Sequence, residues 1–242
     1  MPAERVFAAM NDRPRTTVHL LDGFGLDCDQ ARVHVVPSAR KLVALLALRE
    51  APVTRSVAAA LLWRETTARR AAACLRSTLW RLSEPGVVST ADDTLFLRPG
   101  VEVDFHRARR LVDAATSADR APEPEAVALL RTDLLPGWDY PWLHEEQDWW
   151  REARLRALEA LSARFRSSGD RLRAHQAALA AVQTDPLRES AHRTLVELHL
   201  AEGNPAQAVR QYTAYRLRLR SELGLEPSPE IHRLVRPLLG GR

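Results

Sequence analysis

The chain has little cysteine and no long apolar run. Cys28 and Cys74 are its only cysteines and fit no CxxC spacing, so the sequence predicts neither a disulfide framework nor a zinc site. No stretch of about eighteen apolar residues occurs, and the N-terminus lacks the apolar centre of a signal peptide. These two absences argue against a membrane-spanning helix and against export, and we expect a cytoplasmic protein.

Signatures of catalysis are also missing. The sequence contains no glycine-rich phosphate loop, no Ser-His-Asp order and no dinucleotide-binding fingerprint. His192 and His199 are seven residues apart and share a helix face, but no third metal ligand lies near them in the sequence. We therefore expect no enzyme activity, no cofactor and no metal.

Lysine is almost absent, and the positive charge is unevenly spread. Lys41 is the sole lysine; the first 100 residues hold 14 Lys+Arg against 10 Asp+Glu, and the rest of the chain holds 21 of each. Arginine is the better two-pronged partner for phosphate and for guanine edges. A GC-rich genome, whose codons favour arginine and alanine, explains the composition equally well. The positions of the arginines must decide between these explanations.

The first hundred residues read as a small sheet, three helices and a hairpin. Residues 16–36 contain short alternating apolar runs, which are typical of a small antiparallel sheet. The three helices are expected over residues 39–50, 55–63 and 68–84. Residues 87–100 then predict a hairpin. This is the order of a winged helix-turn-helix of the OmpR type, in which the third helix reads DNA and the hairpin is the wing.

The remainder of the chain is predicted to be almost entirely helical and to contain a repeat. Gly169 and Gly203 are 34 residues apart. The same separation relates three further pairs: Leu161 and Leu195, Ala174 and Ala208, Ala178 and Tyr212. A 34-residue period in helical hairpins is typical of tetratricopeptide repeats. Because two repeats are marginal alone, helices over 145–167 and 231–239 are expected to complete the stack.

Together the two halves resemble a known family. The strings that carry the resemblance are LRSTLWRL in the third helix, DFHRARRLV, LLPG followed by WL, LRALEALSARFRSSGD, and the run from Thr184 to Glu230. Over residues 16–239 they resemble the short form of the bacterial transcriptional activators of the antibiotic-regulatory (SARP) type, whose second domain is the bacterial transcriptional activator domain. The resemblance implies a promoter-binding activator that helps to recruit RNA polymerase.

The third helix is predicted to present two different faces. Ala72, Leu75, Leu79 and Leu82 fall on one stripe at helical spacing, which we expect to be the core face. The opposite face carries the predicted DNA contacts: Arg69, Ala73, Arg76 and Trp80 in a line, with Arg70, Ser77 and Arg81 beside them. An ordinary solvated face is the alternative.

Each of these residues has an expected role. Arg69 and Arg70 stand in the first helical turn, where the macrodipole disfavours cations unless an outside anion such as a phosphate pairs with them. Arg76 lies mid-face, where a guanidinium can contact guanine O6 and N7, and Ala73 is small enough to let the backbone approach the groove floor. Trp80 could contact DNA or pack under the wing, and the sequence leaves both open.

Segments flanking the third helix are expected to supply phosphate anchors. These candidates are Arg40 and Lys41 at the start of the first helix, Thr54 and Arg55 at the start of the second, and Arg98 at the end of the wing. An exposed arginine at a helix start is often only solvated, so each of these is a weaker prediction than the third helix.

Residues 134–150 contain Trp138, Trp142, Trp149 and Trp150 together with four acids. Aromatics beside carboxylates could form a hydrolase site, which would need a deep pocket. Three of the acids, Glu145, Glu146 and Asp148, instead fit the first turn of a helix, where the macrodipole favours them. We predict a structural joint with buried indoles.

The predicted fold is mainly α with small β-sheets: an N-terminal arm (1–15), an OmpR-like winged-helix domain (16–103) and a tetratricopeptide-like helical domain (104–242). The predicted function is sequence-specific activation of transcription at promoter direct repeats. The expected partners are double-stranded DNA, RNA polymerase holoenzyme and a second copy of the chain, at least on DNA. The alternative is a repeat scaffold that binds protein and not DNA.

Overall fold

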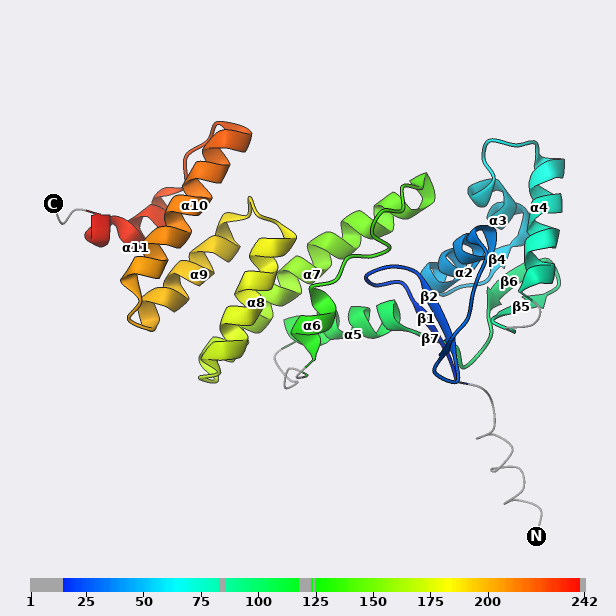
Figure 1. Cartoon of the computed structure of the whole chain (residues 1–242), viewed down its shortest axis with the longest axis horizontal. Helices are drawn as coiled ribbons and strands as arrows, with labels where there is room; N and C mark the ends of the chain where they lie inside the picture. Colours follow the sequence, from blue (N-terminus) through cyan, green and yellow to red (C-terminus); the bar gives the residue numbers. More distant parts are fainter. Residues whose placement is uncertain (1–14, 83–85, 118–122, 124, 240–242) are drawn as a thin grey trace, which may run out of the picture. The chain divides into compact units, whose positions relative to one another are not determined.

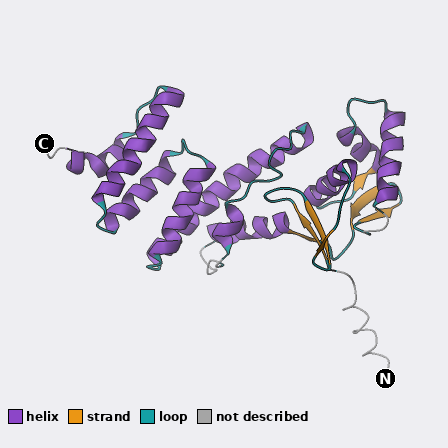
Figure 2. Cartoon of the chain, in the orientation of Figure 1, coloured by secondary structure: helices purple, strands orange, loops and turns teal. Residues whose placement is uncertain are grey.

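The computed structural model describes residues 15–82, 86–117, 123 and 125–239. The arm before Arg15 and the predicted end of the third helix near Glu84 lie outside these residues. Two compact units form, Met1–Arg107 with Asp133–Asp148, and Ala108–Thr132 with Trp149–Arg242. The fold is mainly helical with small sheets near the N-terminus, as predicted (Figures 1 and 2). None of the helices in the described residues is long and apolar enough to cross a membrane.

A four-stranded sheet opens the first unit. Its strands are β1 (Thr16–His19), β2 (Gly25–Cys28), β3 (Ala31–Arg32) and β7 (Glu102–Val103), in the order β3-β2-β1-β7. The first three pair in antiparallel fashion, as predicted. The fourth, β7, pairs parallel to β1, with Val18 opposite Val103. The parallel strand returns only after the helices and the wing, so no local pattern could indicate it.

Three helices follow: α2 (Pro37–Arg49), α3 (Arg55–Leu62) and α4 (Ala68–Arg81). Helix α2 is buried without a break from Leu42 to Leu48, which makes it the centre of this unit. The side chain of Thr54 caps α3 by accepting a hydrogen bond from the Val57 N–H. Thr67 caps α4 in the same way, by accepting from the Arg70 N–H.

The wing is the hairpin of β5 (Val88–Ala91) and β6 (Thr94–Leu97), as predicted. Asp92 turns it with a positive φ of 50°. A third strand, β4 (Val53–Thr54), pairs with β6 and gives the order β4-β6-β5. The sequence predicted no strand at Val53, because a strand of two residues is too short to show alternation.

Residues 133–148 contribute to the first unit. The Leu135 N–H donates to the Leu20 carbonyl at 2.8 Å, and the Asp22 N–H donates to the Asp133 carbonyl at 2.8 Å. The ring of Trp138 stacks on Phe24 with centroids 6.0 Å apart. The winged-helix unit is therefore completed by a segment that follows it by some thirty residues in the chain.

The helical part of the chain contains α5 (Asp104–Thr116), α6 (Ala126–Leu130), α7 (Pro141–Ser167), α8 (Arg171–Thr184), α9 (Glu189–Ala201), α10 (Pro205–Leu223) and α11 (Pro229–Leu239). The 34-residue repeat is confirmed. Gly169 and Gly203 turn the chain between α7 and α8 and between α9 and α10, with φ of 82° and 71°. The residues of the three further pairs named from the sequence are all buried at 3% exposure or less.

Helix α11 closes the stack, as expected. Its residues Ile231 and Val235 join one core cluster with Val196 of α9 and with Ala208 and Tyr212 of α10. Burial of this apolar stripe gives the last repeat the neighbour that it needs.

Candidate nucleic-acid interface

The predicted reading face of α4 is exposed. The four residues in its central line are all exposed: Arg69, Ala73, Arg76 and Trp80. Trp80 is 78% exposed. The three residues placed beside this line, Arg70, Ser77 and Arg81, are exposed as well. Most of the Trp80 side chain is therefore accessible to a binding partner. Trp80 does not pack under the wing, which was one of the two roles that the sequence left open, because most of its side chain is exposed.

The core face of α4 differs from the predicted stripe at two positions. The buried line is Ala71, Leu75, Thr78 and Leu82, whereas Ala72 and Leu79 are only half-buried. Residues 71–73 are three successive alanines, so hydrophobicity does not show which of them faces inward. The packing of α4 against α2 and α3 decides this, and the methyl group of Thr78 is suitable for the core.

The charge on α4 has one sign. The helix holds four arginines and no acid, and no acid stands in its first turn. Among the described residues, Arg69, Arg70 and Arg76 take part in no ion pair. Cations at a helix N-terminus oppose the macrodipole, so an external anion would stabilise this arrangement.

Arg40 and Lys41 already have partners inside the first unit. The Nε–H of Arg40 donates to the Val35 carbonyl at 2.6 Å. The Nζ of Lys41 lies 4.3 Å from the centre of the Tyr140 ring, a cation–π contact. Both side chains are half-buried, so their predicted role as phosphate anchors would have to be shared with these contacts.

The other predicted anchors lie around α3 and the wing. Thr54 caps α3 with its hydroxyl. The Arg55 backbone N–H donates to the Asp93 carbonyl at 2.8 Å, which ties the start of α3 to the wing. Arg98 follows β6 and lies against Gly86, where an added Cβ would come within 2.8 Å of its Nη1. Whether these three contact DNA stays a prediction.

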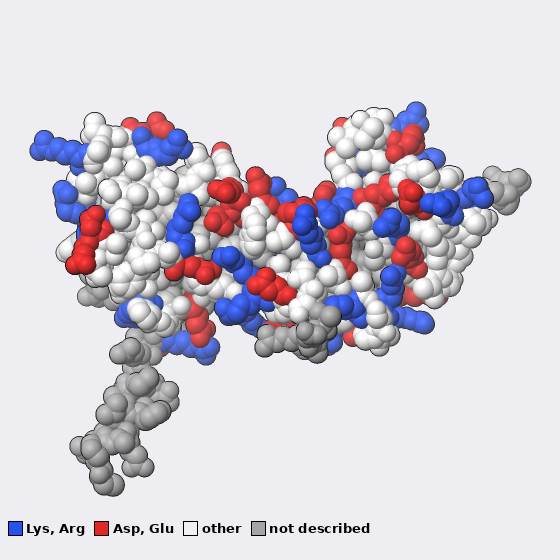
Figure 3. All heavy atoms as spheres, turned by 180° about the vertical axis from the view of Figure 1, so that it is seen from behind, with Lys and Arg blue, Asp and Glu red and all other residues white. Residues whose placement is uncertain are grey.

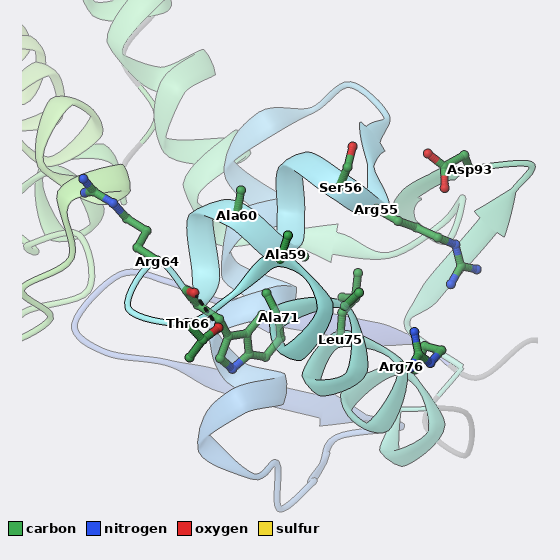
Figure 4. Close-up of a pocket in the computed structure, with 13 residues that line it drawn as sticks. Arg55, Ser56, Ala59, Ala60, Arg64, Thr66, Ala71, Leu75, Arg76 and Asp93 are labelled. Carbon is green, nitrogen blue, oxygen red and sulfur yellow. Dashed lines mark hydrogen bonds between the residues drawn. The ribbon is translucent and has the colours of Figure 1, made fainter.

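A groove between α3 and α4 was not predicted from the sequence. It has a volume of about 680 Å³, and its floor includes Ala59, Ala71 and Leu75, all less than 5% exposed. Arg55 and Arg76 lie at the end of the groove near Asp93 (Figure 4). The only sequence signal is the number of alanines in both helices, because short side chains on two packed helices leave space between them.

On the face drawn in Figure 3, acidic and basic side chains intermingle over both units, and basic side chains protrude at the edge of the first unit. Helix α4 itself holds four arginines and no acid. Basic side chains gathered along one element are the electrostatic footprint expected for nucleic-acid contact.

The tryptophan segment is a structural joint, as predicted. Trp142 is 8% exposed and Trp150 is 1% exposed, and the indole N–H of Trp150 donates to the Thr132 carbonyl at 3.0 Å. Tyr140 stacks on Trp142 with ring centroids 6.0 Å apart. Trp149 is the exception, because 43% of it remains exposed.

The acids of this segment do not lie in the first turn of a helix, where the sequence predicted them. Helix α7 begins at Pro141, so its first turn contains no acid and Glu145 stands in the second turn. Proline at the first helical position explains the earlier start, because its fixed φ suits a helix N-terminus. Glu145 is exposed, and the Asp139 side chain, 93% exposed, lies 2.7 Å from Nε2 of His144. None of the pockets described in the structure is lined by these acids, and a hydrolase site would need one.

Comparisons with known proteins agree on one family. The model of the bacterial transcriptional activator domain matches residues 103–239. The chain is 28% identical over 217 residues to the regulatory protein AfsR of Streptomyces coelicolor, with 84% of this chain and 22% of the relative covered. The chain thus spans about a fifth of the length of that curated relative.

A solved structure shows the same fold. It is titled Mycobacterium tuberculosis EmbR in complex with low affinity phosphopeptide, and it superposes with a TM-score of 0.69 at 19% identity, covering 94% of this chain and 65% of that one. The family model covers more than half of the sequence, and the structural match covers the winged helix and the helical repeats together. The chain belongs to the bacterial transcriptional activators of the SARP type, which carry the bacterial transcriptional activator domain.

Proposed function

We propose that the chain binds promoter DNA in a sequence-specific way, with α4 in the major groove. The acid-free, exposed arginine face of this helix supports the proposal most directly. Arg76 lies in the middle of the face and would contact a guanine edge, whereas Arg69 and Arg70 would pair with phosphates at the helix start. An activator of transcription must reach the DNA, so the chain would act in the cytoplasm.

Two copies of the chain are expected on each operator. One winged-helix module buries only about 600–1,000 Å² against DNA, which is small for a tight complex. Binding to adjacent direct repeats would double this area. The helical unit would hold the two copies together and help to recruit RNA polymerase holoenzyme.

Footprinting of the purified full chain on DNA from its own genomic neighbourhood would test this proposal. We expect protection of two adjacent copies of one short sequence. Titrations at several salt concentrations should show a steep fall in affinity, because contacts to phosphates release counterions. Protection of a single half-site would contradict the pairing of subunits, and the absence of any protected sequence would contradict specific DNA binding.

A protein-binding scaffold is the second candidate. Leu172 of α8 and Leu217 of α10 are 71% and 60% exposed, which would suit a protein partner. This role is compatible with DNA binding if the partner is another copy or the polymerase. A scaffold without DNA binding would protect no DNA sequence, and its interface with a protein partner would lack the steep salt dependence of phosphate contacts.

A further inference from the structure

The groove between α3 and α4 has the size and lining of a small-molecule site. Its volume of about 680 Å³ lies in the range of ligand pockets, roughly 300–1,000 Å³. The floor is apolar because Ala59 and Ala71 face each other from the two helices and Leu75 closes the bottom. The half-buried ring of Trp63, where α3 ends, adds an aromatic wall.

The turn after α3 is held in place by hydrogen bonds. The Trp63 carbonyl accepts from the Thr66 N–H at 3.1 Å and from the Thr66 hydroxyl at 3.0 Å. The Trp63 N–H in turn donates to the Ala59 carbonyl at 3.0 Å. These hydrogen bonds fix the backbone of the turn that carries Trp63.

Charge identifies the kind of ligand. Three arginines, Arg55, Arg64 and Arg76, line the groove against one carboxylate, Asp93. Within the described part of the chain, none of the three arginine side chains forms an ion pair. Figure 4 shows the Arg55 and Arg76 side chains at the same end of the groove and Arg64 at the other. An anionic group would be stabilised beside the guanidinium groups of Arg55 and Arg76.

We propose that this groove binds a small amphipathic organic acid, with its apolar body between α3 and α4 and its anionic group beside Arg55 and Arg76. A neutral apolar molecule would fill the floor but leave the arginines without a partner. A polypeptide is less well matched, because the groove volume of about 680 Å³ is that of a small-molecule site.

Occupancy of the groove would oppose DNA binding. Arg76 lines the groove and also lies on the line of α4 residues that face outward with Arg69 and Trp80. A bound organic acid that contacts the Arg76 guanidinium would prevent this group from contacting a guanine or a phosphate of DNA. This coupling rests on the proposed DNA binding, whereas the site itself does not. Because the two binding equilibria are linked, bound DNA would lower the affinity for the organic acid by the same factor.

The probe for the site is 1-anilinonaphthalene-8-sulfonate, a fluorescent aromatic anion, titrated into the full chain without DNA. Its neutral relative, N-phenyl-1-naphthylamine, has the same ring system without the sulfonate. We expect the anion to bind with at least about threefold higher affinity than the neutral dye, as a surface charge pair allows. Arg76→Gln should remove most of this difference.

Matched variants separate the groove from other apolar surfaces. Ala60 is exposed and lines the groove, so Ala60→Phe should fill the space and weaken the dye about tenfold, a loss of about 1.4 kcal/mol. Ala214→Phe, at an exposed position of α10, should not change dye binding. Arg69→Gln is the charge control, because Arg69 is exposed on the same helix but does not line the groove.

Several results would overturn the proposal. One is unchanged dye affinity in Ala60→Phe, or an equal loss in Ala214→Phe. Equal affinity of the two dyes would reject the anionic class of ligand. The absence of binding by either dye would reject a small-molecule site. If, in addition, Ala60→Phe abolishes transcription in vitro while DNA binding persists, the groove would instead bind a polypeptide. The dye titrations give these answers even if the chain binds no DNA, so the two proposals fail separately. If dye and DNA bind together without competition, the coupling is wrong.

Discussion

Arg76 and Arg69 are both exposed arginines of α4, but their positions on the helix predict different effects on DNA binding. Arg76→Ala should cost about 1–3 kcal/mol on the proper site and relax the preference at one base pair, because a mid-helix arginine reads a base edge. Titrations against specific and random duplexes measure this change. If the ratio of the two affinities is the same as in the wild type, Arg76 reads no base.

Arg69→Ala should weaken all DNA sequences similarly. A phosphate contact carries no sequence information, so its loss should lower the salt slope by about one and leave the specificity ratio intact. The same titrations at several salt concentrations serve as the measurement. A loss of specificity in this variant would mean that the start of α4 lies over bases and not over the backbone.

Trp150→Ala should destabilise the helical unit by about 3–5 kcal/mol, because it removes a buried indole and leaves the Thr132 carbonyl without its donor. Trp149→Ala is the matched control, since Trp149 is 43% exposed and should cost much less. Glu145→Gln should change little. Urea unfolding compares the three variants, and equal losses for both tryptophans would contradict the buried joint.

At the scale of elements, α9 and α10 share a buried histidine. The Nε2–H of His192 donates to the Pro186 carbonyl at 3.0 Å, and its Nδ1 accepts from the Gln211 amide at 2.8 Å. Burial lowers the pKa of His192 below the usual value, and the nearby Arg218 acts in the same direction. The neutral ring thus satisfies both contacts, and a second ring proton would face the Gln211 amide group.

The helical unit should therefore lose stability in mild acid. A lowered folded-state pKa means that the unfolded chain binds the proton first as the pH falls below about 6.5. Stability is fully present above that pH and decreases toward the folded-state pKa. Urea unfolding at pH 7.5 and 5.5 measures the difference, and His192→Gln should reduce it. Burial and the neighbouring His175 also lower the pKa of His199, which should contribute in the same direction. An unchanged pH dependence in His192→Gln would contradict this assignment.

At the scale of the whole molecule, the boundary of the winged-helix unit has a measurable consequence. The Asp104 carboxylate accepts from the Leu20 and Leu21 N–H groups at 2.9 and 3.2 Å, and Leu135 pairs with the Leu20 carbonyl. A fragment of residues 1–103 lacks these partners. It should melt at a lower temperature than a fragment of residues 1–148.

Thermal melts of the two fragments test this expectation. The substitution Asp104→Asn in the full chain is the control, since it weakens the same contacts without shortening the chain. Equal melting temperatures for both fragments would show that residues 133–148 add nothing to the stability of the winged helix. DNA affinity should return only with the helical unit if that unit pairs the subunits.

The sequence alone predicted the fold class, the wing, the third helix of the first unit and the helical repeat, because each depends on short-range or periodic signals. Alternating apolar residues, helical spacing and the 34-residue period are all of this kind. The exposed line of α4 could be predicted for the same reason, since Arg69, Arg76 and Trp80 differ in chemistry from the core positions.

Only the tertiary structure decided features that depend on distant segments. The parallel pairing of β7 with β1 and the addition of residues 133–148 to the first unit join parts far apart in the sequence. The inward face of the three successive alanines and the groove beside them depend on how closely α3 and α4 approach. Small side chains permit several packings, so their periodicity does not specify one; the contacts made by the neighbouring helices do.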